Sequence, residues 1–186
     1  MLTEIIVSGF GGQGVLFAGK CLAYSALQIG ACSSEELHIS WLPSYGPEMR
    51  GGTANCSVCL SDEPIGSPLV TEPDILIAMN DPSVERFSGS VKPGGKVFLD
   101  SSMASAEISR TDVEVFRVPA SQAAQDNGLS GMGNIVLLGK VLKECSQMLG
   151  GIVRETVEKA FHEIIPAARA ALIEKNIAAL NIGMGI

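Results

Sequence analysis

The sequence lacks both a long apolar run and an excess of positive charge. No run reaches the roughly 18 consecutive apolar residues that a transmembrane helix requires. Lysine and arginine together number 13 against 20 aspartate and glutamate residues, which gives a formal net charge of -7. A nucleic-acid-binding protein usually presents a basic surface. We therefore expect neither a membrane nor a nucleic acid among the partners of this protein.

Cysteine is scarce, and its positions are widely spread in the sequence: Cys21, Cys32, Cys56, Cys59 and Cys145. Cys56 and Cys59 spell C-x-x-C, but they fall within a predicted strand, where residues three apart point to opposite faces. No second pair supplies the remaining ligands of a zinc or iron–sulfur site, and a thioredoxin-type motif would open a helix. We expect reduced, mostly buried thiols and a cytoplasmic protein.

Residue sets for catalysis and for targeting are also missing. The two histidines, His38 and His162, lie far apart in the sequence without an evident serine, cysteine or aspartate partner. We therefore assign no catalytic residue and no metal ligand. Residues 1–4 include no basic side chain and precede an apolar run of only strand length, so we expect no secretory signal.

What the sequence has is a regular alternation of strand-like and helix-like segments. After a first apolar run that ends in a glycine turn, strands are predicted at residues 37–42, 53–60, 74–79, 96–100 and 113–118. Helices are predicted at residues 15–29, 83–87, 134–149, 156–165 and 167–180, with another short helix after Pro119. This order is typical of an α/β fold with a Rossmann-like, mostly parallel sheet flanked by helices and a helical C-terminal tail. We expect residues 1–186 to form a single domain, with a local antiparallel hairpin formed by the strand 53–60 and a short return after a turn at residues 62–68.

Three glycines, Gly9, Gly11 and Gly14, follow the first apolar run at the G-x-G-x-x-G spacing of a phosphate-binding turn. Glycine allows a positive φ and close backbone approach, and the start of the next helix offers unpaired N–H groups to an anion. Alternatively, the same glycines only make a tight turn that lets helix and strand pack closely. A nicotinamide site also needs an acidic residue near the end of the second strand, and the end of the segment 37–42 has none. The spacing is therefore a weak sign of NAD binding.

The segment at residues 43–52 is rich in glycine and proline and is predicted to be a loop. Because ligands bind beyond the carboxyl ends of parallel strands, we expect this loop to lie beside the glycine turn. Arg50 is the best anion-binding side chain of the loop, and the alternative is a Glu48–Arg50 pair that only orders a surface turn. Asn80 either lines the same edge or caps the next helix. The candidate binding residues are Gly9, Gly11, Gly12, Gln13, Gly14, Ser44, Tyr45, Glu48, Arg50, Gly51 and Asn80.

A resemblance to a known family rests on two motifs, GFGGQGV at residues 9–15 and WLPSYGPEMRGG at residues 41–52. Shorter matches follow at residues 64–68, 73–74 and 79–80. With these motifs the chain resembles the gamma subunit of the 2-oxoacid:ferredoxin oxidoreductases. The 2-oxoglutarate type is the most similar, and the branched-chain 2-oxoacid and pyruvate types are the next candidates.

The resemblance implies a heteromultimeric enzyme of ketoacid metabolism that oxidatively decarboxylates a 2-oxoacid, transfers the acyl group to coenzyme A and reduces ferredoxin. Thiamine diphosphate, Mg²⁺ and iron–sulfur clusters are then expected in alpha, beta and ferredoxin-like delta partner subunits, with none bound by this chain alone. The chain would be an interface domain near the active site, inactive in isolation, and Arg50 a hypothetical contact to a phosphate of coenzyme A. A free-standing Rossmann dehydrogenase and a nucleotide- or acyl-CoA-binding protein are the alternatives.

Overall fold

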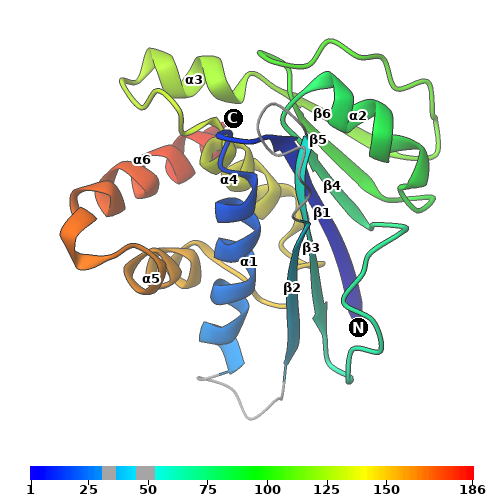
Figure 1. Cartoon of the computed structure of the whole chain (residues 1–186), viewed down its shortest axis with the longest axis horizontal. Coiled ribbons are helices and arrows are strands. Elements are labelled where there is room, and N and C mark those ends of the chain that lie inside the picture. Colours follow the sequence, from blue (N-terminus) through cyan, green and yellow to red (C-terminus); the bar gives the residue numbers. More distant parts are fainter. Residues whose placement is uncertain (31–36, 45–52) are drawn as a thin grey trace.

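The structure of the chain, a computed structural model, describes residues 1–30, 37–44 and 53–186 (Figure 1). Its strands are β1 (Leu2–Phe10), β2 (His38–Ser44), β3 (Thr53–Ser61), β4 (Ile75–Ala78), β5 (Lys96–Asp100) and β6 (Glu114–Val118). Its α-helices are α1 (Val15–Gly30), α2 (Asp81–Phe87), α3 (Ala120–Asp126), α4 (Gly133–Cys145), α5 (Arg154–Ile164) and α6 (Ala171–Gly185). Two short 3₁₀ helices are η1 (Ser88–Ser90) and η2 (Ala167–Arg169). The predicted elements are therefore present, although α4 ends four residues before the predicted position 149.

The strands form a six-stranded sheet in the order β2-β3-β1-β4-β5-β6. Strand β1 pairs in parallel with β4, β4 with β5, and β5 with β6. Strand β3 is antiparallel to both of its neighbours, β1 and β2. Strand β2 therefore runs in the direction of β1, with β3 between them. The α/β fold and the mostly parallel sheet are confirmed, and the β1–α1–β2 unit is present with its two strands separated.

The antiparallel part of the sheet differs from its prediction in its pairing. Residues 62–74 contain no strand, so the partner of β3 is not a return after the turn at residues 62–68. Prolines at positions 64 and 68 supply no N–H group for a ladder, and β3 is buried along almost its whole length, which favours a central position between two strands. Strand β2 also continues through Pro43 and Ser44, which were predicted as loop. Proline is tolerated there because β2 is an edge strand.

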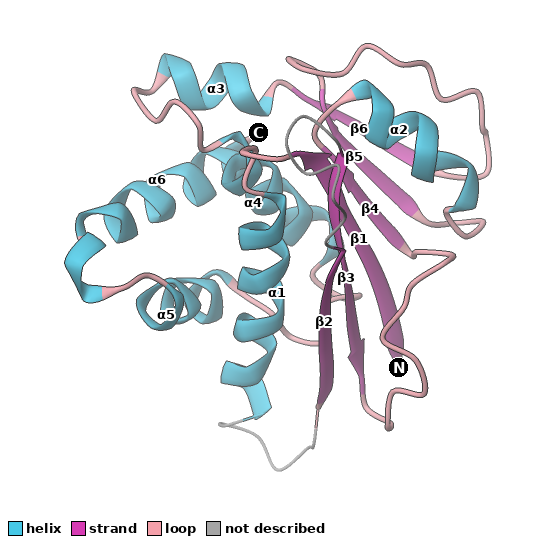
Figure 2. Ribbon diagram, viewed as in Figure 1, coloured by secondary structure: helices cyan, strands magenta, loops and turns pink. Residues whose placement is uncertain are grey.

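Helices and loops cover the two faces of the sheet unequally (Figure 2). The first face packs on α1 and α4 and contains Ile5, Val7 and Cys56 in the larger apolar core. The second face packs on α2 and on long connections, with Ile6 and Cys59 in a smaller core. Cys56 and Cys59 thus point to opposite faces, as predicted for a strand. None of the helices in the described residues is long and apolar enough to span a bilayer.

The C-terminal helix α6 packs closely against α4 through two glycines. A Cβ atom on Gly183 would collide with the carbonyl oxygen of Val136, and one on Gly139 would collide with the carbonyl oxygen of Leu180. Only glycine lets these two helix backbones approach so closely. The predicted helical tail is therefore confirmed, and it packs on α4, which covers the first face of the sheet.

Candidate functional site

The glycine turn connects the carboxyl end of β1 to the start of α1. The backbone N–H of Gln13 donates to the carbonyl oxygen of Phe10 at 3.1 Å and closes the turn. Gly12 and Gly14 have φ values of 98° and 72°, which side chains with a Cβ rarely adopt. Gly9 is needed for another reason, since a Cβ there would lie 2.9 Å from the Cβ of Met79. These glycines thus allow a tight turn, and Gly9 also allows close packing against the end of β4. Gly12 differs, because an added Cβ there would meet no heavy atom within 4 Å.

The Gln13 side chain ties this turn to the end of β4. Its Oε1 accepts hydrogen bonds from the backbone N–H of Phe10 at 2.6 Å and from Asn80 Nδ2 at 3.1 Å. Its Nε2 donates to the carbonyl oxygen of Met79 at 3.1 Å. Asn80 is buried, and its Oδ1 accepts from the N–H of Ser83, so it caps α2. Gln13 and Asn80 are therefore positioning residues that hold the ends of β1 and β4 together.

The second predicted loop is described only at its flanks. Ser44 pairs with Asn55 on β3, and Asn55 pairs with Ser8 on β1, so β2 and β1 end at the same edge of the sheet. Residues 45–52 of the second loop lie outside the described residues, so its expected position beside the glycine turn stays a prediction. The other predicted members of the site, Tyr45, Glu48, Arg50 and Gly51, lie outside the described residues.

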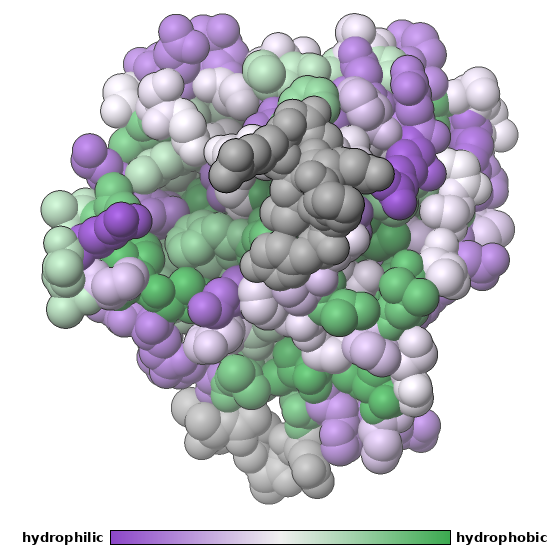
Figure 3. Space-filling view, in the orientation of Figure 1, coloured by the Kyte–Doolittle hydropathy of each residue, from purple (hydrophilic) through white to green (hydrophobic). Residues whose placement is uncertain are grey.

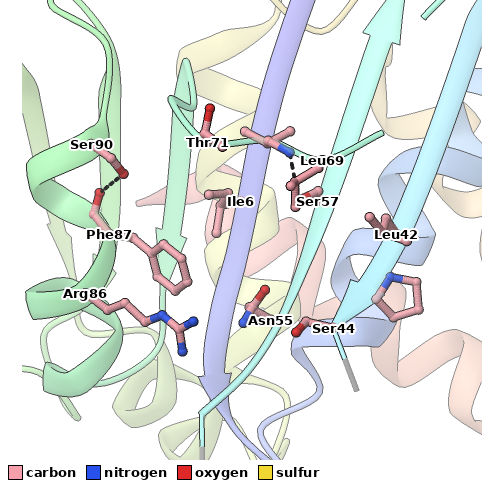
Figure 4. Close-up of a pocket in the computed structure, with 12 residues that line it drawn as sticks. Ile6, Leu42, Ser44, Asn55, Ser57, Leu69, Thr71, Arg86, Phe87 and Ser90 are labelled. Atoms are coloured by element: carbon pink, nitrogen blue, oxygen red, sulfur yellow. Dashed lines mark hydrogen bonds between the residues drawn. The ribbon is translucent and has the colours of Figure 1, made fainter. Parts of the chain in front are cut away.

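A groove of about 480 Å³ lies on the second face of the sheet between α2 and the strands β1 to β3 (Figure 4). We call it the sheet-face groove, and its lining includes Leu42, Ser44, Asn55, Leu69, Arg86 and Phe87. Arg86 reaches from α2 toward Asn55 and Ser44 (Figure 4). Its Nη1 lies 3.5 Å from Thr53 Oγ1, and its guanidinium lies 5.1 Å from the centre of the Phe87 ring. Among the lining residues Arg86 is the one charged side chain.

A second hollow, of about 560 Å³, lies between the glycine turn, the start of α4 and the connection between α5 and α6. We call it the glycine-turn hollow, and its lining includes Gly12, Gly14, Asn134, Pro166, Arg169 and Asn176. Asn134 Nδ2 donates to the carbonyl oxygen of Gly14 at 3.0 Å and fixes the start of α4 against the turn. Arg169 is exposed on η2 and lies at the wall of the hollow. Helices α1 and α4 both begin beside this hollow, since Gly14 and Asn134 are among its lining residues.

Sequence reasoning did not identify Arg86, Arg169 or Asn55. The two arginines lie on separate short helices, and only the fold brings each of them beside a hollow. Asn55 offered a signal, because a polar residue alternates with buried ones along β3. Such alternation indicates a strand face that lacks a full apolar cover.

The described part of the chain contains no group of three or more His, Cys, Asp or Glu side chains placed to hold a metal ion. The thiols at Cys21, Cys56, Cys59 and Cys145 are buried and unpaired. Burial raises the pKa of the Cys56 thiol to about 12, so the thiolate that a metal or cluster requires is strongly disfavoured. These residues do not fit an iron–sulfur cluster.

Comparison with known proteins identifies the family to which this chain belongs. The model described as pyruvate ferredoxin/flavodoxin oxidoreductase matches residues 4–186. The ketoisovalerate oxidoreductase subunit VorA of Methanothermobacter thermautotrophicus is 39% identical over 97% of this chain and 35% of its own length. This chain therefore spans about a third of that relative. The 2-oxoglutarate synthase subunit KorC of Methanocaldococcus jannaschii is 32% identical over 98% of this chain and 92% of its own length.

A solved structure agrees with these relatives. The gamma subunit of a keto/oxoacid ferredoxin oxidoreductase from Geobacter sulfurreducens is 28% identical and has a TM-score of 0.80. The match covers 100% of this chain and 95% of that subunit. The predicted resemblance is thereby confirmed, and the chain belongs to the pyruvate ferredoxin/flavodoxin oxidoreductase family.

Proposed function

We propose that the chain is the gamma part of a 2-oxoacid:ferredoxin oxidoreductase. The complex would convert a 2-oxoacid, coenzyme A and oxidised ferredoxin into acyl-CoA, carbon dioxide and reduced ferredoxin. The observation that carries this proposal is the end-to-end match to a separate gamma subunit, which covers 100% of one chain and 95% of the other. Residues 1–186 would act as a single unit in this complex. The free, buried thiols are compatible with the reducing cytoplasm.

In this proposal the chain is an interface domain and holds no redox cofactor of its own. Its described residues offer no metal-ligand cluster, and its buried thiols do not fit an iron–sulfur cluster. Alpha, beta and ferredoxin-like delta subunits would hold thiamine diphosphate, Mg²⁺ and the iron–sulfur clusters. Ferredoxin would meet the complex and exchange electrons with those clusters.

The chain would also contact coenzyme A. The glycine-turn hollow combines exposed turn backbone at Gly12, the beginnings of two helices and the cation of Arg169, which together suit a diphosphate. The amides of Asn134 and Asn176 add polar groups to the same hollow. We expect Arg50 to supply a further phosphate contact from the second loop.

A free-standing nucleotide- or acyl-CoA-binding protein is the second candidate, and the positive φ values of the glycine turn favour it. A nicotinamide site is disfavoured by the topology. Strand β3 separates β2 from β1, so the end of β2 lies two strand spacings, roughly 10 Å, from the glycine turn. The described end of β2 also has no carboxylate to bind a ribose.

Affinity purification of the tagged chain from its native cell tests the proposal. We expect a thiamine-diphosphate subunit and an iron–sulfur subunit to copurify in fixed ratio, together with 2-oxoacid-dependent reduction of ferredoxin. Recovery of the chain alone as a stable monomer that binds NADH saturably at micromolar concentration would contradict the proposal and favour the free-standing alternative.

A further inference from the structure

We propose that the sheet-face groove receives an extended segment of a partner subunit that carries a carboxylate next to an apolar side chain. This inference rests on the proposed function, since it requires a partner subunit. The groove lies on the second face of the sheet and shares no lining residue with the glycine-turn hollow. Arg86 would bind the carboxylate, and Leu42 and Leu69 would contact the apolar side chain.

The charge of the groove indicates an acidic partner. Within the described residues, Arg110, Arg117 and Arg154 each pair with a carboxylate of this chain. No carboxylate in the same part of the chain pairs with Arg86, although the protein carries a formal net charge of -7. The guanidinium presents five N–H donors in a planar fork that suits a carboxylate. A carboxylate from a partner would therefore find a cation that no acid in the described part of the chain neutralises.

The apolar part of the groove indicates a protein segment in place of a small ion. Leu42 is 38% exposed and Leu69 is 60% exposed, and both line the groove. Hydrophobic residues reach the surface over β2, β3 and the neighbouring connection in Figure 3. A free anion would leave these leucines in water, whereas a bound chain segment would bury them. Burial of apolar surface contributes roughly 25 cal/mol per Å² to association.

Polar groups between Arg86 and the leucines would pair with the backbone of such a segment. The Asn55 amide and the Ser44 hydroxyl point into the groove beside Arg86 (Figure 4). Ser57 lines the same groove, and its Oγ accepts from the backbone N–H of Val70 at 3.3 Å. An extended chain carries alternating N–H and C=O groups along one edge, and spaced side-chain donors and acceptors suit it.

The assembled complex tests this inference through the affinity of the gamma chain for its partner subunits. We expect Arg86→Glu to weaken that affinity roughly tenfold or more, because the substitution places like charges together across the interface. Arg117→Glu makes the same change of charge at a site outside the groove, and it should leave the affinity within about twofold. Thermal unfolding of each isolated variant shows whether its fold is intact, and only variants that unfold like the wild type are compared.

Photo-crosslinking from position 44 identifies the occupant. A photoreactive residue in place of Ser44 should crosslink to an acidic, extended segment of a partner subunit, and 1 M salt should reduce the yield. Equal affinity of Arg86→Glu and wild type in an assembled, active complex would overturn the inference and leave the proposed function intact. A crosslink to a second copy of this chain would overturn it as well. So would the absence of any crosslink to a partner subunit together with binding of inorganic phosphate in the groove. Failure of the wild-type chain to assemble at all would instead count against the proposed function.

Discussion

Asn80 Nδ2 donates a hydrogen bond of 3.1 Å to Gln13 Oε1 and so joins the ends of two parallel strands that are far apart in the sequence. The same Gln13 amide also donates to the carbonyl oxygen of Met79. The glycine turn is therefore held from β4, and its exposed backbone at Gly11 and Gly12 is presented in a fixed position.

Gln13→Glu should lower the free energy of unfolding by about 1–3 kcal/mol, because it removes the donor to Met79 and places a carboxylate beside a carbonyl oxygen. Urea unfolding of the isolated chain measures the change. Gln28→Ala is the matched control, since Gln28 donates to Glu163 on the surface and its replacement should cost less than about 0.5 kcal/mol. Equal stability of Gln13→Glu and wild type would show that the amide network is not structurally important.

Gly183→Ala should destabilise the chain by about 2 kcal/mol or more, because the new methyl group would collide with the carbonyl oxygen of Val136 in α4. Gly185→Ala on the same helix is the control. An added Cβ there meets no heavy atom within 4 Å, so stability should be unchanged or slightly higher. Chemical denaturation distinguishes the two, and similar midpoints would contradict the close α4–α6 contact.

Asp81 should make stability depend on acidic pH. Hydrogen bonds from the backbone N–H groups of Ala106 and Ser105 hold the pKa of its carboxyl group below the ordinary value of 3.8. Because the folded pKa is the lower one, the stabilisation is complete above about pH 4 and is lost as pH falls through the folded pKa. Asp81→Asn should therefore reduce stability at pH 6 and flatten its decline below pH 4, as measured by urea unfolding at several pH values. A decline as steep as that of the wild type would exclude Asp81 as a contributor.

The alternation of helices and strands and the turn after β1 could be predicted from the sequence because both follow from local patterns. Apolar periodicity distinguishes helix from strand, and glycine marks the turn after β1. The position of β3 between β1 and β2 depends on pairing between segments distant in sequence, which periodicity does not encode. The partners of Gln13 lie at the end of β4 and could not be predicted from the sequence, and for Asn80 the structure shows the capping role.

Arg169→Ala should raise the KM for coenzyme A of the assembled enzyme roughly tenfold with little change in kcat, because a phosphate contact is equally strong in the ground state and the transition state. Arg154→Ala is the control, since Arg154 pairs with Glu158 on α5 and does not line the glycine-turn hollow. Steady-state kinetics at varied coenzyme A concentration measure both variants. An unchanged KM for Arg169→Ala would remove this residue from the proposed coenzyme A contact.

Reconstitution of the complex with and without this chain tests the central claim most directly. Purified partner subunits would be mixed with a 2-oxoacid, coenzyme A and oxidised ferredoxin, and ferredoxin reduction would be followed by absorbance. We predict that reduction coupled to acyl-CoA formation appears only when the chain is added, and that the chain alone gives none. Full acyl-CoA formation by the partners without the chain would contradict its role as the gamma subunit.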